Sequence, residues 1–450
     1  MKPIPHPVFP GRWLILASRL FVALLVLRTT RSHAADDFRF PVRFEGIYRL
    51  EGTRDGSQWD ILEPSIIGRA ADITRPRSLL PAGFTEARLV PDAFVDLDPM
   101  LERLREKHHL PGLAAIVIRS NRVLAAGAVG VRVEGTDAPV MLGDVWHHGS
   151  LTKSMTATLA GMLVEEGRIR WDTTLGDILG TKVTDMHPGW RPVTLSQLLR
   201  HRAGAPDHDQ LVTNGVWRAL WRRRDGISDK RTQWLRAVTT NAPVSAPGTK
   251  YLYSNTGYVF AGMMLESVTG KSWEDLMRER LFAPLSMDTA GFGPPGTPGR
   301  TNQPWGHQWI AGVPVGTRPG PNADNPPALG PAGTMHGSLF DLAKYLMWHA
   351  RRGSGPGPAL LRSETFRQLH TPEAGETYAF GWAVSHRPWA GGKALNHTGS
   401  NTQWFSNAWV APEKQAALLV LTNIGDGTNN LAFKATDAVL SRLVSDHLRR

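Results

Sequence analysis

Residues 148–153 read His-Gly-Ser-Leu-Thr-Lys, and residues 154–163 continue as Ser-Met-Thr-Ala-Thr-Leu-Ala-Gly-Met-Leu. The apolar residues of the second stretch recur at steps of three and four, which predicts a helix with a buried face. This places Ser150 at the start of the helix and Lys153 about one turn further on. Residues three apart share a helix face, so the serine hydroxyl and the lysine amine are expected to meet.

That arrangement suits a serine nucleophile. A serine hydroxyl reacts slowly unless a base lies beside it. Lys153 can act as this base when burial disfavours its charged form and lowers its pKa. The helix N-terminus would also face negative charge that develops on an attacked carbonyl group. A capping serine beside a solvated lysine gives the same four residues, so the interpretation depends on the rest of the chain.

Composition describes a folded protein and excludes some chemistries. The chain has 450 residues, of which 41% are hydrophobic and 20% charged, enough for two or three domains. It contains no cysteine, which excludes a thiol nucleophile, a disulfide scaffold and cysteine metal ligands. The net charge is +11, and no aromatic-rich nucleic-acid-binding motif accompanies the densest basic run, residues 222–224. We therefore expect no nucleic-acid partner, and the charge favours possible association with an anionic cell envelope.

Residues 1–35 resemble an export signal. They carry five basic residues and no acidic one, and residues 20–27 form an apolar run that ends shortly before the small residues Ala34 and Ala35. We expect a cleaved signal peptide and a periplasmic or secreted protein. The alternative is an N-terminal membrane anchor, although the apolar stretch 13–27 is shorter than the roughly 20 residues that a span requires.

Strand patterns gather at both ends of the remaining chain. Residues 113–118 and 123–131 are apolar and β-branched around a Ser120-Asn121 turn, and four more strands are expected within 378–421. Helical patterns dominate between them, and a last helix follows residue 430, with Phe433 on its apolar face. We predict an α+β fold with three layers (α/β/α). Its antiparallel sheet is built from both chain ends and flanked by helices, with an inserted, mostly helical subdomain.

Two segments fit this scheme less well. Residues 36–93 mix strand-like alternation at 38–44 with scattered glycine, proline and charge, and we assign them to an N-terminal extension of unknown role ahead of a catalytic domain at 94–450. Residues 290–334 are rich in proline and glycine but contain Trp305 and Trp309, which favours a packed loop at the rim of the site.

Two further motifs complement the serine and lysine. Tyr253-Ser254-Asn255 lies between a turn and a helix, where the tyrosine can exchange protons and the asparagine can hold a substrate amide. His397, Thr398, Gly399 and Ser400 end an expected strand, along whose edge a substrate backbone can lie. Alone, each motif is equally consistent with a packed tyrosine, a helix cap or an ordinary strand end.

The order Ser-x-x-Lys, Tyr-x-Asn, His-Thr-Gly resembles the serine β-lactamase and penicillin-binding superfamily, whose usual triplet is Ser-x-x-Lys, Ser-Asp-Asn, Lys-Thr-Gly. The Tyr-x-Asn form is similar to the branch that contains class C β-lactamases, D-stereospecific peptidases and related esterases. The resemblance covers residues 94–450 and extends to the segments 194–204, 247–257 and 331–346.

The resemblance implies a role for each motif residue. Ser150 would be acylated, Lys153 and Tyr253 would share the general-base work, and Asn255 would hold the acyl side chain. His397, Thr398 and Gly399 would bind substrate, and the backbone N–H groups of Ser150 and Ser400 would form the oxyanion hole. Glu165 and Glu166 lie on the Ser150 helix and are not expected to take part.

One departure bears on the substrate. Residue 397 is histidine where β-lactamases usually have lysine, and histidine is mostly neutral at pH 7. This favours an esterase or D-peptidase over a β-lactamase, with esters, D-amino-acid peptides and β-lactams all still fitting as small-molecule or short-peptide substrates. The alternative is a non-catalytic binding or structural protein on the same scaffold. The oligomeric state is open.

Other catalytic classes find no support. The chain has no Gly-x-Ser-x-Gly and no His-Glu-x-x-His motif. We expect no metal and no cofactor, because the histidine pairs 108–109 and 147–148 and the segment 207–209 lack a third ligand at a metal-site spacing. We interpret these histidines as surface residues.

Overall fold

The computed structural model describes nine stretches of the chain, which are residues 37–41, 47–67, 72–76, 83–84, 86–206, 215–221, 226–355, 359–427 and 429–449. The expected signal or anchor at 1–35 and the basic run at 222–224 lie outside these stretches. Within them, no helix is both long enough and apolar enough to cross a membrane.

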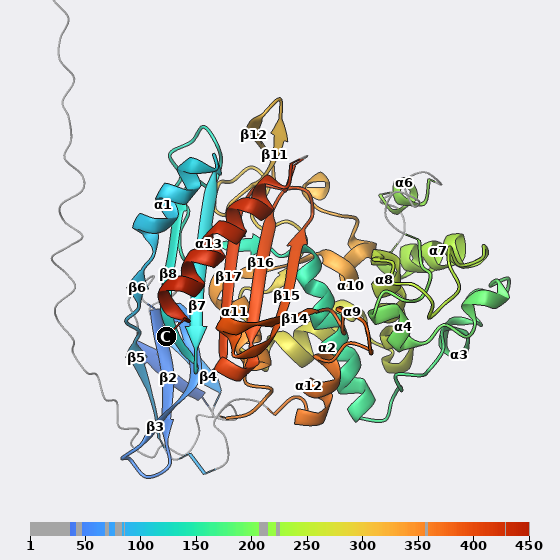
Figure 1. Cartoon of the computed structure of the whole chain (residues 1–450), viewed down its shortest axis with the longest axis horizontal. Coiled ribbons are helices and arrows are strands. Elements are labelled where there is room, and N and C mark those ends of the chain that lie inside the picture. Colours follow the sequence, from blue (N-terminus) through green and yellow to red (C-terminus); the bar gives the residue numbers. More distant parts are fainter. Residues whose placement is uncertain are drawn as a thin grey trace, which may run out of the picture.

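A seven-stranded sheet forms the centre of the molecule (Figure 1). Its strands run in the order β14-β15-β16-β17-β7-β8-β6, so the two ends of the chain meet in the middle, where β17 pairs with β7, as predicted. In chain order the strands are β6 (Val95–Asp96), β7 (Gly112–Arg119), β8 (Arg122–Gly130), β14 (Ala383–Arg387), β15 (Gly392–Ser400), β16 (Phe405–Ala411) and β17 (Ala416–Thr422).

The sheet is mixed rather than purely antiparallel. Neighbouring strands are antiparallel from β14 to β8, but the edge strand β6 pairs with β8 in parallel. The chain reverses twice between these two strands, once after helix α1 (Asp98–Lys107) and once at the β7–β8 hairpin, so they run the same way. At that hairpin Ser120 and Asn121 have φ of 48° and 61°, the left-handed pair that a tight two-residue turn requires.

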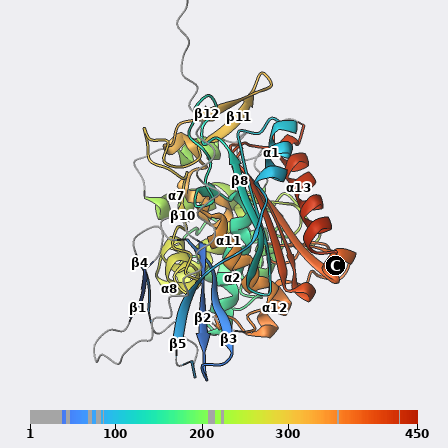
Figure 2. The same cartoon turned by 90° about the vertical axis from the view of Figure 1, so that its left-hand side faces the viewer.

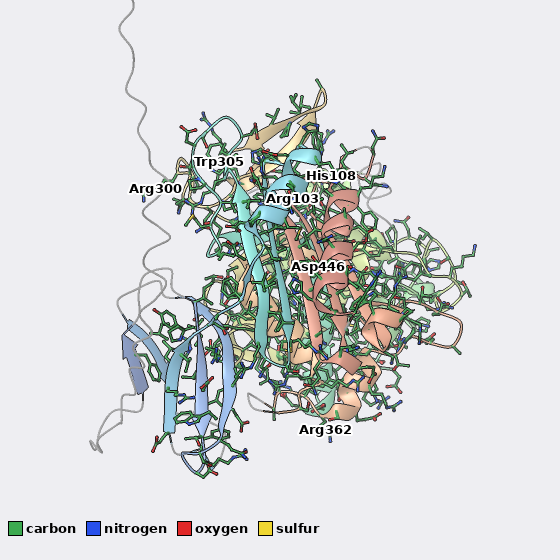
Figure 3. The ribbon with its side chains drawn as sticks, turned by 60° about the vertical axis from the view of Figure 1, so that its left-hand side comes forward. Arg103, His108, Arg300, Trp305, Arg362 and Asp446 are labelled. Carbon is green, nitrogen blue, oxygen red and sulfur yellow. The ribbon has the colours of Figure 1, made fainter. Side chains whose placement is uncertain are left out.

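Helices cover both faces of the sheet. Helices α1 and α13 (Leu431–His447) lie on one face, and α2 (Thr152–Glu165), α8 (Asn255–Thr269) and α11 (Leu339–Ala350) lie on the other side (Figures 1 and 2). Alternate residues of β7 join opposite cores: Ile116 packs with the α2 side, and Val117 packs with the α1 side. Because both faces are buried, the central strands are continuously apolar. Figure 3 labels Arg103 of α1, His108 just beyond its end, and Asp446 of α13, all on the layer that covers this face.

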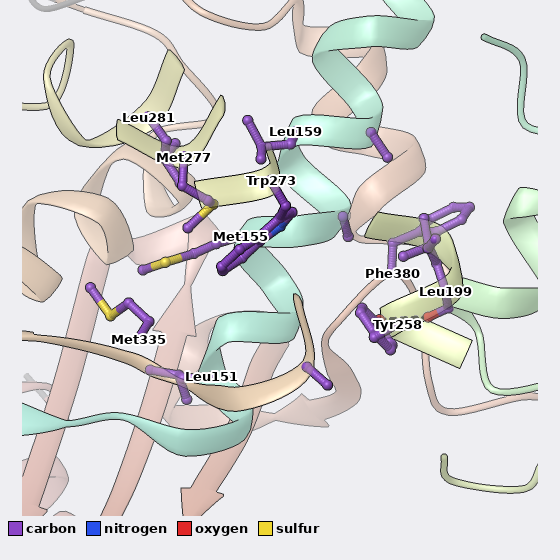
Figure 4. Close-up of a cluster of buried hydrophobic side chains, with 14 of the residues drawn as sticks. Leu151, Met155, Leu159, Leu199, Tyr258, Trp273, Met277, Leu281, Met335 and Phe380 are labelled. Atoms are coloured by element: carbon purple, nitrogen blue, oxygen red, sulfur yellow. Dashed lines mark hydrogen bonds between the residues drawn. The ribbon is translucent and has the colours of Figure 1, made fainter. Parts of the chain in front are cut away.

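The mostly helical part is inserted between β8 and β14, as predicted. Its further elements are α3 (Leu175–Leu179), α4 (Leu195–Leu199), α6 (Val216–Leu220), α7 (Ile227–Thr239), α9 (Trp273–Met277), η4 (Arg278–Phe282), α10 (Gly330–Gly333) and α12 (Ser363–Leu369). Met155 and Leu159 of α2 pack beside Trp273 and Met277 of α9 in the core that joins this part to the sheet (Figure 4).

The proline- and glycine-rich segment is a packed loop, as its tryptophans suggested. It contains strand β10 (Gly291–Phe292), a hairpin of β11 (Gly306–Ile310) and β12 (Val313–Thr317), and the short turns η5 (Pro321–Ala323) and η6 (Pro327–Leu329). The Trp309 indole N–H donates to the Gly425 carbonyl oxygen at 3.1 Å, which ties the hairpin to the end of β17. The segment then enters β13 (Met335–Ser338), which pairs with β9 (Val145–His147) ahead of Ser150.

The N-terminal extension folds as a small β-structure with its own apolar cluster. It consists of β1 (Asp37–Pro41) paired with β4 (Asp72–Pro76), and a sheet of β2 (Ile47–Thr53), β3 (Trp59–Ile67) and β5 (Glu86–Pro91). Of the expected strand at 38–44, residues 42–44 lie outside the described part. The extension attaches through Glu63, which accepts hydrogen bonds from Arg75 at 2.7 Å and from Lys344 of α11 at 2.8 Å.

Two expected details are wrong. The strand expected at 378–385 begins only at Ala383, because residues 379–382 turn sharply around Gly381, whose φ is 77°. Phe433 was placed on the buried face of the last helix but is 43% exposed. It lies in the first turn of α13, where it meets Phe405 edge-on at 6.4 Å instead of entering the core.

Candidate active site

Ser150 lies in a single 3-10 turn, η2 (Gly149–Leu151), that runs directly into α2. Strand β9 delivers the chain to this turn, and Gly149 takes a φ of 51° to make it. The Thr152 hydroxyl donates to the Gly149 carbonyl oxygen at 2.7 Å and also accepts the Met335 backbone N–H at 3.2 Å. These bonds hold the turn against β13, so the backbone around Ser150 is fixed from two sides.

The Lys153 amine is fully buried and makes three short polar contacts. Its Nζ donates to Ser150 Oγ at 2.9 Å, Asn255 Oδ1 at 2.7 Å and the Ala332 carbonyl oxygen at 2.8 Å. Among the described residues, these contacts include no carboxylate. Burial therefore lowers the Lys153 pKa well below the ordinary lysine value, as a base at neutral pH requires.

The Tyr-Ser-Asn motif meets this pair from the start of α8. The Lys153 Nζ lies 4.9 Å from the centre of the Tyr253 ring, and the Tyr253 hydroxyl is hydrogen-bonded to Ser150. Tyr253 is 37% exposed as a residue, but burial around its oxygen raises the pKa of the phenol, which the bond to Ser150 only partly offsets. At pH 7 Tyr253 is therefore a neutral hydroxyl group, able to donate or relay a proton.

Strand β15 brings the third motif against the nucleophile turn through two glycines. A Cβ at Gly399 would lie 1.9 Å from the His148 carbonyl oxygen and 2.9 Å from the Ser150 nitrogen. A Cβ at Gly149 would lie 2.3 Å from the Ser400 nitrogen. Only glycine permits this approach. The two backbone N–H groups expected to form the oxyanion hole, those of Ser150 and Ser400, thus flank one glycine–glycine contact.

His397 is buried and neutral. Its Nε2 lies 3.0 Å from the Tyr378 hydroxyl, and its Nδ1 contacts the Thr398 carbonyl oxygen. Burial, with a contribution from the charge of Lys153, lowers the His397 pKa to about 3. The position that carries a lysine in the usual Lys-Thr-Gly motif therefore holds an uncharged ring here.

The structure brings the Ser-x-x-Lys and Tyr-Ser-Asn motifs into direct contact and sets the end of β15 against the nucleophile turn. It also adds residues that sequence reasoning missed. His147 Nδ1 accepts the Gly149 N–H at 3.0 Å, and His147 Nε2 lies 2.8 Å from Asp324 Oδ1. Asn401 donates to the same Asp324 oxygen at 2.9 Å. This chain links the nucleophile turn, the proline-rich loop and the end of β15. The adjacent pair His147-His148 was the only sequence signal for it.

The interpretation of that pair as surface histidines is wrong. His147 is 1% exposed and His148 is fully buried. The His148 Nε2 lies 3.0 Å from the Gly337 carbonyl oxygen, which joins the nucleophile turn to β13. His147 is the last residue of β9 and His148 follows it directly, so both side chains lie in the protein interior. Of the other pair, His109 is exposed, as expected, whereas His108 is half-buried.

The part of the chain that the structure describes holds no group of three or more histidine, aspartate or glutamate residues placed to bind a metal ion. The segment 207–209 lies outside that part. The groups that the structure places around Ser150 are a buried amine, a neutral phenol, an amide and two backbone donors.

Comparison with known proteins agrees with this geometry. The family model described as Beta-lactamase matches residues 97–441. Penicillin-binding protein 4 of Amycolatopsis lactamdurans is 31% identical over 340 residues, which cover 73% of this chain and 84% of that protein. A D-aminopeptidase of Cereibacter sphaeroides is 28% identical over 337 residues, 73% of this chain and 59% of that protein.

A similar fold occurs in the octameric penicillin-binding protein homologue from Pyrococcus abyssi, with a TM-score of 0.61 and 23% identity over 78% of each chain. The matched family segment covers the central sheet except its edge strand β6, most of the helices that flank it, and all three motifs. The chain is a serine hydrolase that belongs to the beta-lactamase family.

Proposed function

We propose that this protein is an acyl-serine hydrolase that cleaves esters or D-amino-acid peptides in preference to β-lactams. The observation that carries the catalytic part is the contact of 2.9 Å between Ser150 Oγ and the buried Lys153 amine. The extension at 36–93 and the catalytic domain at 94–450 remain the proposed domain organisation, and export from the cytoplasm remains the proposed localisation.

The proposed reaction begins with neutral Lys153. The Ser150 O–H proton passes to Nζ while Oγ attacks the substrate carbonyl carbon. The N–H groups of Ser150 and Ser400 stabilise the resulting oxyanion, a contribution that reaches about 3 kcal/mol per donor in other hydrolases. The proton then passes through the Tyr253 hydroxyl to the departing alkoxide or amine, which leaves an acyl-serine. A water molecule attacks this ester by the same steps in reverse and regenerates Ser150.

The electrostatics at residue 397 support the proposed substrate class. A lysine at this position would offer a fixed positive charge to a substrate carboxylate, whereas the buried, neutral His397 offers a ring held by Tyr378. Substrates whose bound segment carries no carboxylate would form no ion pair with a lysine at 397, so histidine at this position does not weaken their binding. Esters and internal or N-terminal D-peptide bonds are of this kind, whereas penicillins carry a carboxylate.

The test is intact-mass spectrometry over time on the wild type and on Ser150→Ala, with a penicillin and separately with an activated short-chain ester. We expect a transient ester adduct on the wild type alone, and little or slowly lost penicillin adduct. Rapid turnover of penicillin with a persistent ester adduct would overturn the substrate preference. Absence of adducts and of turnover with both compounds would support a non-catalytic binding protein instead.

A second variant tests the role of residue 397 directly. His397→Lys is expected to increase penicillin acylation relative to ester acylation, because it restores a cation beside Thr398. His386→Lys is the matched control, since His386 is an exposed histidine on the neighbouring strand β14. An unchanged ratio in His397→Lys would contradict the proposed reason for the preference.

A further inference from the structure

His201 holds both backbone neighbours of Tyr253. It follows α4, is 2% exposed and has a left-handed φ of 59°. Its carbonyl oxygen accepts the Leu252 N–H at 2.8 Å, and its Nδ1 accepts the Ser254 N–H at 3.1 Å. The residue before Tyr253 and the residue after it are therefore both bonded to one histidine.

The His201 side chain also packs against the Tyr253 ring. The two ring centres are 4.3 Å apart, and the rings of Tyr378 and Tyr258 lie 4.8 and 5.2 Å from His201 on its other sides. Because Nδ1 accepts a hydrogen bond, the neutral imidazole carries its proton on Nε2. That nitrogen is buried and has no hydrogen-bond partner among the described residues, so it faces the aromatic rings.

We propose that His201 is a positioning residue that sets the place of the Tyr253 hydroxyl between Ser150 and Lys153. The proposal rests on the proposed function, in which Tyr253 relays the leaving-group proton. The two backbone hydrogen bonds fix the position of the Tyr253 main chain, and the ring contact fixes the orientation of its side chain. Removal of these restraints moves the phenol oxygen, and a displacement of about 1 Å at a reacting group can cost two orders of magnitude in rate.

Only a neutral imidazole can do this work. A protonated ring would lose the acceptor for the Ser254 N–H and would add a cation near Lys153 and His397. Burial, followed by the influence of Lys153 and His397, holds the His201 pKa well below its ordinary value. The aromatic rings that pack against His201 are those of Tyr251, Tyr253, Tyr258 and Tyr378.

Two variants separate the acceptor from the ring. His201→Asn keeps a short acceptor near the Nδ1 position and tolerates a positive φ, but it removes the ring. His201→Phe keeps the ring and removes the acceptor, which leaves the Ser254 N–H unpaired. We expect His201→Phe to lower kcat for an activated ester by about tenfold to a hundredfold with KM changed less than about threefold, and His201→Asn to recover part of that loss.

A double-mutant cycle with Tyr253→Phe tests whether the effect runs through Tyr253. In the Tyr253→Phe background, His201→Phe is expected to change kcat by less than about twofold, because the hydroxyl that it positions is gone. The control is His187→Phe: the His187 Nδ1 also accepts a backbone N–H, from Gly189 at 3.0 Å, but it lies outside the site. It is expected to leave kcat and its pH profile unchanged.

All rates are divided by the fraction of protein whose Ser150 is labelled by a fluorophosphonate, and thermal unfolding is recorded for each variant. Equal kcat per labelled site in His201→Phe and wild type would overturn the proposal, as would full additivity with Tyr253→Phe. Failure of the wild type to be labelled at Ser150 would instead overturn the proposed function, so the two failures are distinguishable.

Discussion

Gly399 lies against the backbone of His148 so closely that any side chain at 399 would collide with it, because a Cβ there would stand 1.9 Å from the His148 carbonyl oxygen. This contact joins the end of β15 to the turn that carries Ser150. This contact sets the distance between the two backbone N–H groups of the proposed oxyanion hole, because the Ser150 N–H belongs to the turn and the Ser400 N–H belongs to β15.

Gly399→Ala is therefore expected to lower kcat/KM for an activated ester by at least about a hundredfold, the size of the effect when one oxyanion donor is lost. The measurement is steady-state ester hydrolysis. The control is Gly226→Ala, a glycine with φ of −63° whose added Cβ would meet nothing closer than 3.4 Å. Near-normal activity in Gly399→Ala would show that β15 and the turn are not mechanically coupled.

The pH dependence of acylation should report Lys153. Because burial lowers the Lys153 pKa, the neutral amine forms below the pH at which a free lysine deprotonates, and kcat/KM should rise with pH and then level off well below pH 10.5. The Tyr253 pKa is raised, so Tyr253→Phe should lower the plateau and keep the same acid limb. Loss of that limb in Tyr253→Phe would make the tyrosine the titrating base.

Asp324→Asn is expected to lower kcat about tenfold with little change in thermal stability. The carboxylate lies 2.8 Å from His147 Nε2, where its negative charge favours a proton on that nitrogen, and the other nitrogen of the ring accepts the Gly149 N–H that holds the nucleophile turn. The rate of Ser150 labelling by a fluorophosphonate measures this directly. Asp288→Asn, a 58%-exposed aspartate in the same half of the chain, is the control. Equal labelling rates in Asp324→Asn and wild type would remove Asp324 from the site.

The extension should stabilise the whole chain through Glu63. Burial opposes the ionisation of this carboxyl, but the charges of Lys344 and Arg75 outweigh burial and lower its pKa. Glu63→Gln is expected to reduce the free energy of unfolding by about 3 kcal/mol at pH 7, because it leaves Lys344 and Arg75 without their shared partner. Urea unfolding measures this.

The sign of the pH effect follows from the lowered pKa. Stability from Glu63 is fully present above the pKa of the unfolded chain, near 4.3, and is lost as pH falls through the lower folded value. The difference in the free energy of unfolding between the wild type and Glu63→Gln should therefore become smaller as the pH falls. Glu364→Gln, which breaks a solvent-exposed and therefore well-screened pair with Arg367, should leave the free energy of unfolding almost unchanged at any pH. A difference between the wild type and Glu63→Gln that does not change with pH would contradict a stabilising role of the ionised Glu63.

Local patterns were enough to predict the central features. The apolar runs of β7 and β17 predicted buried strands, and hence a sheet built from both ends of the chain. The helical pattern after Ser150 predicted the contact between Ser150 and Lys153, because residues three apart share a helix face. The parallel pairing of β6 did not, because two residues carry too little pattern to show direction.

The parts that could not be predicted depend on tertiary contacts between distant segments. Asp324 meets His147 across 177 positions of chain, and nothing near either residue indicates the other. The burial of His148 depends on β13, which comes from a proline-rich loop without periodicity. His201 acts through its backbone conformation and a ring contact, neither of which leaves a repeat in the sequence.

The fully buried Lys153 has a consequence for folding. The unfolded chain binds a proton at this amine more readily than the native protein does, so the native state becomes relatively more stable as pH rises towards 10.5. An apolar side chain of similar length, as in Lys153→Met, would remove this dependence of stability on pH, but it would leave the Asn255 and Ala332 oxygens without the donor that Lys153 supplies. The buried amine that serves as the proposed base therefore also holds two separate segments of the chain together.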